Sequence, residues 1–118
     1  MFLEQLSQIS NRIHGALALS LVDADGIPIE SVNAHPDLDL EVLAAETVAQ
    51  VRTMQSSYAE LASGPFRQCS ITTSELTLMI SSLANGYFLL LVLDRDISLG
   101  QARFELLRAR LVLESELA

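Results

Sequence analysis

Apolar and polar side chains recur along the chain with two periods, one typical of helices and the other of strands. Phe2 to Ile13 places leucine and isoleucine at helical spacing, and Gly15 just beyond fits a helix stop. Ala16–Val22 is apolar at almost every position. Such a run predicts a strand in the middle of a sheet, because only a central strand is covered on both faces.

The segment after this strand indicates a hairpin. Asp25-Gly26 is a dipeptide that favours a tight turn between antiparallel strands, so Ile27 to Val32 is predicted to be the return strand. Pro28 lies within this strand and has no backbone N–H to give to a neighbour. We therefore expect the second strand at an edge of the sheet.

A long helix is predicted from Leu38 to about Ala62, and it ends near Gly64-Pro65. It begins among acidic residues, which the positive end of the helix dipole favours. These are Asp37, Asp39 and Glu41. One face should cover the sheet and carries Leu40, Leu43, Ala44, Thr47, Val51, Met54, Tyr58 and Leu61.

Three short runs follow and predict a meander of antiparallel strands: Phe66–Thr73, Leu76–Leu83 and Tyr87–Leu93. Asn85-Gly86 between the last two runs is a second hairpin signal. Ser98-x-x-Gln101 is a capping-box pattern that introduces a final helix. Helical spacing predicts its buried face to be Leu99, Ala102, Leu106, Ala109, Leu113 and Leu117.

These elements predict one domain over residues 1–118, an α/β sandwich of the α+β type with the order αββαβββα. The two most apolar strands, Ala16–Val22 and Tyr87–Leu93, should lie side by side in the middle. The expected fold is a five-stranded antiparallel sheet in the order 2-1-5-4-3. The long middle helix should cover one face, and the first and last helices the other.

The middle helix carries a second apolar stripe on the side opposite to the first. Its side chains are small or of modest size: Leu38, Val42, Ala45, Ala49 and Ser56. A helix that only covers a sheet should be polar there, whereas small side chains let another helix approach closely. Alanine is also simply a good helix former. The outward valine and leucine nevertheless favour a docking face for a second copy or for another protein.

Strand Phe66–Thr73 is the other predicted edge of the sheet. It is mostly polar, with Cys69 and Ile71 as its few apolar points. An open edge presents unpaired backbone groups, so it must be paired or protected.

Composition limits the partners. The net charge is −8, and the seven arginines are scattered along the chain, which argues against nucleic acid. No apolar run approaches the roughly 20 residues that a membrane span needs, so we expect no membrane insertion. The N-terminus lacks the pattern of an export signal, and Cys69 is the only thiol. We therefore expect a cytoplasmic protein.

Candidate chemistry is sparse. His14, His35 and one cysteine cannot supply the nitrogen and sulfur ligands of a usual zinc site. The chain has no lysine, so it has neither a P-loop lysine nor a Schiff-base lysine. The Gly-x-Ser-x-Gly pattern of a nucleophilic serine is also missing. We expect no catalytic residue, no cofactor, no metal and no enzymatic activity.

Two segments are similar to those of a known family. Leu21–Gly26, followed by Ile29 and Ser31, is similar to the first hairpin of roadblock/dynein light-chain domains. Ser98-Leu99-Gly100 followed by Arg103 is similar to their entry into the last helix. With the element order, the chain resembles this family, particularly its bacterial MglB-like members. The resemblance implies a homodimer or heterodimer in which the middle helices pack together and the third strands pair.

On this resemblance, we expect the dimer interface to contain Leu38, Val42, Ala45, Ala49, Ser56, Arg67, Cys69 and Ile71. MglB-like members bind a small Ras-like GTPase and stimulate its hydrolysis by ordering the active site of the GTPase itself, without an arginine finger. Outward positions of the middle helix are candidate contacts for such a partner: Glu46, Gln50 and Thr53.

Two other functions stay open. A pure scaffold subunit of a motility, polarity or trafficking complex has the same sequence features. A small-molecule sensory module of PAS or profilin type needs a polar-lined internal pocket, and the inward positions here are predicted to be filled by leucine, isoleucine and valine.

Overall fold

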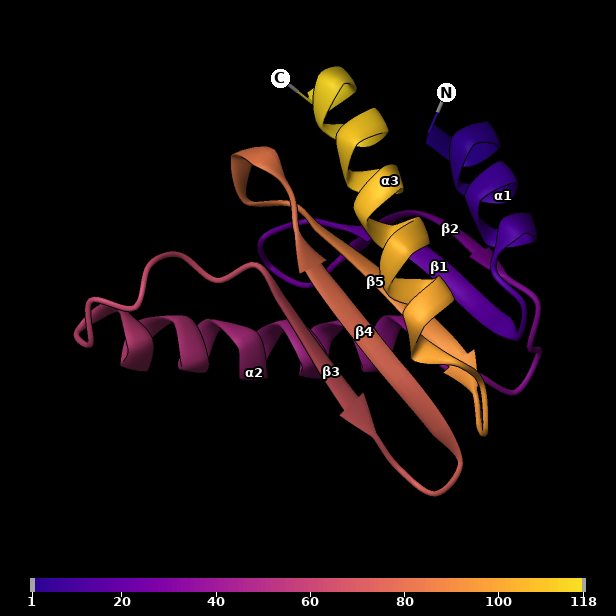
Figure 1. Cartoon of the computed structure of the whole chain (residues 1–118), viewed down its shortest axis with the longest axis horizontal. Coiled ribbons are helices and arrows are strands. Elements are labelled where there is room, and N and C mark those ends of the chain that lie inside the picture. The colour runs from indigo at the N-terminus through magenta and orange to yellow at the C-terminus, as the bar shows by residue number, and fades with distance from the viewer. Residues whose placement is uncertain (1, 118) are drawn as a thin grey trace.

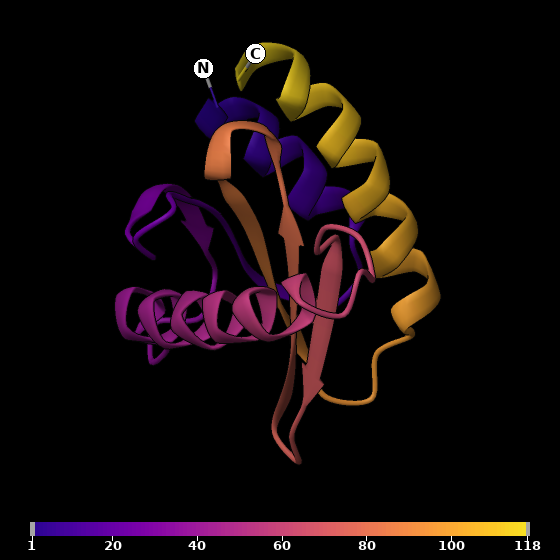
Figure 2. The same ribbon diagram turned by 90° about the vertical axis from the view of Figure 1, so that its left-hand side faces the viewer.

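The computed structural model describes residues 2–117 and has three layers, with a sheet between one helix on one face and two helices on the other (Figures 1 and 2). The order αββαβββα is as predicted. The elements are α1 Phe2–Arg12, β1 Ala16–Val22, β2 Pro28–Asn33, α2 Leu40–Ala59, β3 Gln68–Thr72, β4 Leu76–Ser82, a 3₁₀ turn η1 Ala84–Gly86, β5 Phe88–Asp94 and α3 Leu99–Leu117.

The sheet is antiparallel with the order β2-β1-β5-β4-β3, which confirms the predicted topology. Its two central strands are the apolar ones: Leu19 of β1 pairs with Leu91 of β5, and both side chains are fully buried. β2 begins at Pro28 and forms one edge, as the missing N–H predicts. β3 forms the other edge.

The central strands divide the interior into two apolar clusters. Leu89 and Leu91 of β5 point toward α1 and α3, whereas Leu90 and Val92 point toward α2. This alternation is the period of a strand with both faces covered. The continuous apolar runs of the sequence therefore reflect two cores, one on each side of the sheet.

Helix α2 is shorter at both ends than predicted. Asp39 is its N-cap, because the side chain accepts a hydrogen bond of 3.2 Å from the backbone N–H of Val42. The helix consequently begins at Leu40 instead of Leu38. It ends at Ala59, and the chain then turns through left-handed backbone at Ala62 (φ 51°) and Gly64 (φ 85°).

The predicted sheet-facing stripe of α2 is confirmed in its middle, where Ala44 and Val51 are fully buried. Val48 is also buried and was not predicted. The prediction is wrong for Tyr58 and Leu61, which are 53% and 66% exposed. Figure 1 shows the reason, since the C-terminal part of α2 runs past β3, the last strand of the sheet.

On the other face, α3 buries most of its predicted positions. Ala102, Leu106, Ala109 and Leu113 are at most 1% exposed, and Leu99 and Leu117 are partly buried against the same cluster. The predicted capping box is not formed by Gln101. Its side-chain amide instead donates to the backbone carbonyl of Arg12 at 3.3 Å, which ties α3 to the end of α1.

Candidate interaction surface

The outer face of α2 is a continuous exposed surface of small side chains. The predicted interface residues Val42, Ala45, Ala49 and Ser56 all lie on it, and Val42 is 57% exposed. Because three of these four side chains are small, the backbone of α2 can be approached closely along this face.

The candidate partner contacts lie on the same exposed side of α2. Glu46, Gln50 and Thr53 are all exposed. The Thr53 hydroxyl donates to the carbonyl of Ala49 at 3.1 Å, within its own helix. Its methyl group is therefore the part left for an outside contact, whereas Glu46 and Gln50 offer polar groups.

Leu38 does not share this face. It precedes the helix, is half-buried, and packs against the apolar cluster between α2 and the sheet. The prediction that Leu38 belongs to the helical stripe is therefore wrong. The N-cap is Asp39, so the helix begins at Leu40 and Leu38 lies before it.

The β3 edge lies beside this helix. Within residues 2–117, β3 pairs only with β4, with Cys69 opposite Ile80 and Ile71 opposite Leu78. Cys69, Ile80 and Leu78 belong to the cluster beneath α2, so the apolar side chains of β3 point to the α2 side of the sheet. Ile71 is 37% exposed because no further strand covers it.

Arg67 lies just before β3 and is exposed. Its backbone carbonyl accepts a hydrogen bond of 2.9 Å from the N–H of Ser82, which fixes the start of the edge strand against β4. The structure thus brings the exposed face of α2 and the apolar points of β3 to one margin of the molecule.

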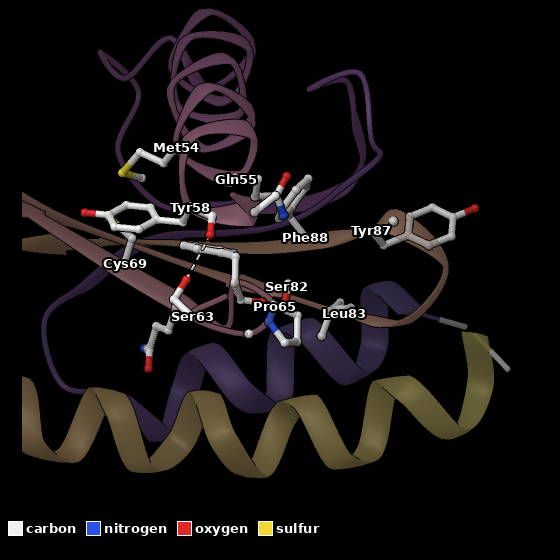
Figure 3. A pocket seen from close by; sticks show the side chains of 15 residues that line it. Met54, Gln55, Tyr58, Ser63, Pro65, Cys69, Ser82, Leu83, Tyr87 and Phe88 are labelled. Carbon is white, nitrogen blue, oxygen red and sulfur yellow. Dashed lines mark hydrogen bonds between the residues drawn. The ribbon is translucent and has the colours of Figure 1, made fainter. Parts of the chain in front are cut away.

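A cavity of about 560 Å³ opens at the same margin (Figure 3). It lies between the C-terminal half of α2, the loop that follows, and the starts of β3 and β5. Apolar and aromatic side chains contribute much of its lining, among them Met54, Tyr58, Phe66, Cys69, Tyr87 and Phe88.

Two serine hydroxyls hold the loop that walls this cavity. Ser63 donates to the carbonyl of Tyr58 at 3.1 Å, and Ser82 donates to the carbonyl of Phe66 at 2.9 Å. The sequence pattern predicted filled inward positions, and the two clusters are filled. The cavity was not predicted because it forms where α2 extends past the sheet. The periodicity of apolar residues does not show how far a helix extends beyond the strands that it covers.

Two kinds of site are missing from the part of the chain that the structure describes. Residues 2–117 hold no group of three or more histidine, cysteine or acidic side chains suited to a metal ion. Among the helices of that range, none is long and apolar enough to cross a membrane.

The model of the Roadblock/LC7 domain family matches residues 2–94. No curated protein sequence matches significantly.

Solved structures share the fold at low identity. MglB of Myxococcus xanthus is 22% identical, with a TM-score of 0.81 over 96% of this chain and 89% of that one. A Roadblock/LC7 domain of Streptomyces avermitilis is 19% identical, with a TM-score of 0.85 over 98% and 97% of the two chains. A structure described as MglB with tetrameric arrangement is 19% identical, with a TM-score of 0.83 over 96% and 88%. Because the family model covers most of its length, the chain belongs to the Roadblock/LC7 domain family.

Proposed function

We propose that this chain is a non-catalytic dimeric regulator or scaffold that binds a small Ras-like GTPase and stimulates its GTP hydrolysis. The main support for a dimer is that the C-terminal part of α2 extends beyond β3, the edge strand of the sheet (Figure 1). Tyr58 and Leu61 are exposed on or just after this overhang. A second copy that pairs along β3 would bring its own sheet under these side chains and bury them.

The outer face of α2 supports the same arrangement. Ala45 and Ala49 are exposed and small, so the α2 helices of two copies can pack closely across a two-fold axis. Cys69 and Ile71 of β3 face the same side of the sheet and would join that contact. Assembly of a related chain, the tetrameric MglB, is consistent with a chain that works in more than one copy.

Glu46, Gln50 and Thr53 are the proposed contacts for the GTPase. The nearby arginine of α2, Arg52, is directed elsewhere, because its guanidinium lies 3.8 Å from Asp25 and donates to the carbonyl of Ala24 at 3.5 Å. Arg52 therefore points toward the β1–β2 turn of its own chain. Stimulation would therefore act by ordering groups that the GTPase already has.

Sedimentation equilibrium tests the dimer. Wild type should sediment as a dimer. Ala45→Glu and Ala49→Glu should sediment as monomers with unchanged circular dichroism, because dimerisation would bury the new carboxylate in the contact between the two copies. Gln8→Glu is the control, since it adds the same group on α1 at an exposed position. A monomeric wild type, or a dimer that tolerates both charges, would remove the proposed interface.

Single-turnover GTP hydrolysis tests the regulator. Small Ras-like GTPases from the same cell are loaded with GTP and mixed with wild type or with Glu46→Arg. We expect faster hydrolysis with wild type and a smaller effect with the variant. Binding without acceleration would instead support the pure scaffold, and no binding to any of these GTPases would reject both.

The cavity favours one alternative, a small-molecule sensory module. Native mass spectrometry of the purified chain decides between them. A stoichiometric bound small molecule, lost in a Tyr58→Ala variant, would move the sensory function ahead of GTPase regulation.

A further inference from the structure

Helix α3 carries a second apolar stripe that its own fold does not cover. Phe104, Leu107 and Leu111 are 58%, 57% and 70% exposed. Their spacing places them on one side of the helix, opposite the buried Ala102 and Ala109. Figures 1 and 2 show α3 as an outer layer, on the opposite face of the sheet from α2.

Such a stripe is not needed for the sheet. A helix that covers a sheet on one side is expected to be polar on the other. The inner face of α3 already contributes a complete set of buried side chains to its cluster. Three large apolar residues in line on the outer face therefore indicate a contact with another molecule.

The charged side chains beside the stripe are mostly basic, with Glu114 as an acidic neighbour next to Leu111. Arg103 and Arg110 flank it on one side and Arg108 on the other, although the chain as a whole has a net charge of −8. The guanidinium of Arg108 lies 5.7 Å from the centre of the Phe104 ring, so it extends along the stripe.

These arginines differ in whether an acidic side chain pairs with their charge. Arg108 and Arg110 form ion pairs with Glu105 and Glu114 on the same helix. Arg103 has no acidic partner among residues 2–117. Its charge is therefore available to an outside group.

We propose that the outer face of α3 docks an amphipathic helix of a protein partner, apolar along one side and acidic at its flanks. Phe104 to Leu111 spans about 10 Å along the helix axis, so roughly two to three turns of a partner helix cover the stripe. This surface lies on the face of the sheet opposite α2. It goes beyond the proposed function, because it leaves the dimer and GTPase contacts free and lets the protein join a GTPase to a third component.

A second copy is a poor occupant of this stripe. Antiparallel pairing of two α3 helices centred on Leu107 brings Arg108 of each copy together at the axis. Parallel pairing instead brings Arg110 of one copy beside Arg108 of the other. Because Glu105 is shared between Arg12 and Arg108, a net positive charge stays beside the stripe in each copy. Like charges brought together are destabilising, so the pattern favours a partner with the opposite charge.

A membrane surface is also disfavoured. Anionic lipid attracts clusters of unpaired basic residues, whereas two of the three arginines here are already paired with glutamates. The net charge of −8 adds repulsion at longer range. A short acidic helix needs only the local charge of Arg103 and the apolar stripe.

Peptide binding tests this docking site. The chain has no tryptophan, so a single tryptophan in a synthetic peptide reports binding by its fluorescence. The probe is a helical peptide of roughly 14 residues with leucines on one face and glutamates at both flanks. A matched peptide has lysine in place of each glutamate.

We expect the acidic peptide to bind wild type and the lysine peptide to bind at least about tenfold more weakly. Leu107→Glu should weaken binding of the acidic peptide about tenfold or more, and Arg103→Glu severalfold. Ile27→Glu is the control, because Ile27 is 59% exposed and lies in the β1–β2 turn, away from α3. It should leave binding unchanged, and circular dichroism verifies the fold of each variant.

Three results would overturn the proposal. The first is a lack of specificity, seen either as equal binding of the two peptides or as equal loss of binding in Ile27→Glu and Leu107→Glu. The second is binding of wild type to phosphatidylglycerol vesicles that Leu107→Glu abolishes, which would assign the stripe to a membrane. The third is a wild-type assembly that sediments with a mass above that of the α2 dimer and becomes smaller in Leu107→Glu. That result would assign the stripe to contact with a second copy.

Discussion

The guanidinium of Arg12 donates a hydrogen bond of 3.0 Å to the carboxylate of Glu105, and this ion pair joins the end of α1 to α3. The Glu105 side chain is only 8% exposed, and it also accepts from Arg108 at 3.1 Å. A carboxylate this far from water needs such compensation, because the charge loses most of its hydration. The two arginines, which are 40% and 50% exposed, keep part of theirs.

Replacing Glu105 should therefore weaken the contact between the two helices. Glu105→Ala is expected to lower the free energy of unfolding by about 1 to 3 kcal/mol, because both arginines lose a charged acceptor. Urea unfolding followed by circular dichroism measures this loss. Glu75→Ala, in the exposed β3–β4 turn, is the control and should change little. Equal stability of the two variants would show that the ion pair contributes nothing.

Gly26 should not tolerate a side chain. Its φ is +84°, and an added Cβ would lie 3.0 Å from the Cα of Ala45 and 3.3 Å from the Cβ of Val48. Gly26→Ala therefore combines left-handed backbone with a close contact against α2, and we expect a loss of about 2 to 4 kcal/mol.

A matched glycine separates these two costs. Gly64 has nearly the same φ of +85° but no atom within 4 Å of an added Cβ. Gly64→Ala should lose only about 1 to 2 kcal/mol, the cost of the backbone alone. Thermal unfolding of both variants gives the comparison, and equal losses would show that the contact with α2 yields without cost.

The reactivity of Cys69 should depend on protein concentration. Its thiol is half-buried in β3 and lines the cavity at the proposed dimer margin. Pairing along β3 would reduce access to it, so labelling by a thiol reagent should slow severalfold as the chain dimerises. In Ala49→Glu the labelling rate should stay high at every concentration. A concentration-independent rate in wild type would contradict pairing at this edge.

Leu61 should matter to the dimer and not to the monomer. It is 66% exposed just beyond α2, so Leu61→Ser is expected to change the stability of the monomer by less than about 0.5 kcal/mol. The dimer dissociation constant should rise about tenfold, because the side chain becomes buried only against the second copy. Leu3→Ser on α1, 49% exposed in the structure, is the control for sedimentation. An unchanged dissociation constant in Leu61→Ser would contradict the proposal that a second copy covers the end of α2.

The fold was largely predictable because its signals are local. The apolar runs of β1 and β5 mark two strands covered on both faces, and Pro28 assigns β2 to an edge. The limits of α2 were less predictable. Asp37 and Asp39 both suit an N-cap, and only the structure shows that Asp39 accepts the hydrogen bond.

The proposed interaction surfaces were predictable only in part. The exposed stripe of Ala45 and Ala49 on α2 is visible in the sequence because a complete core stripe lies opposite. The stripe of Phe104 and Leu107 on α3 was not predicted, because the buried positions of α3 already account for the helical periodicity of that segment. The cavity had no local signal, since it depends on how far α2 extends past β3.

The two margins of the sheet are not equivalent. β2 begins with Pro28, whose ring removes a backbone donor, and its pairing with β1 shifts register between Leu21 and Val22. β3, by contrast, is regular and open. Strand addition at β3 can therefore join one neighbour, after which both remaining margins of the pair are the interrupted β2 kind. Under the proposed pairing, the dimer would therefore be a finite unit that does not extend into a fibre.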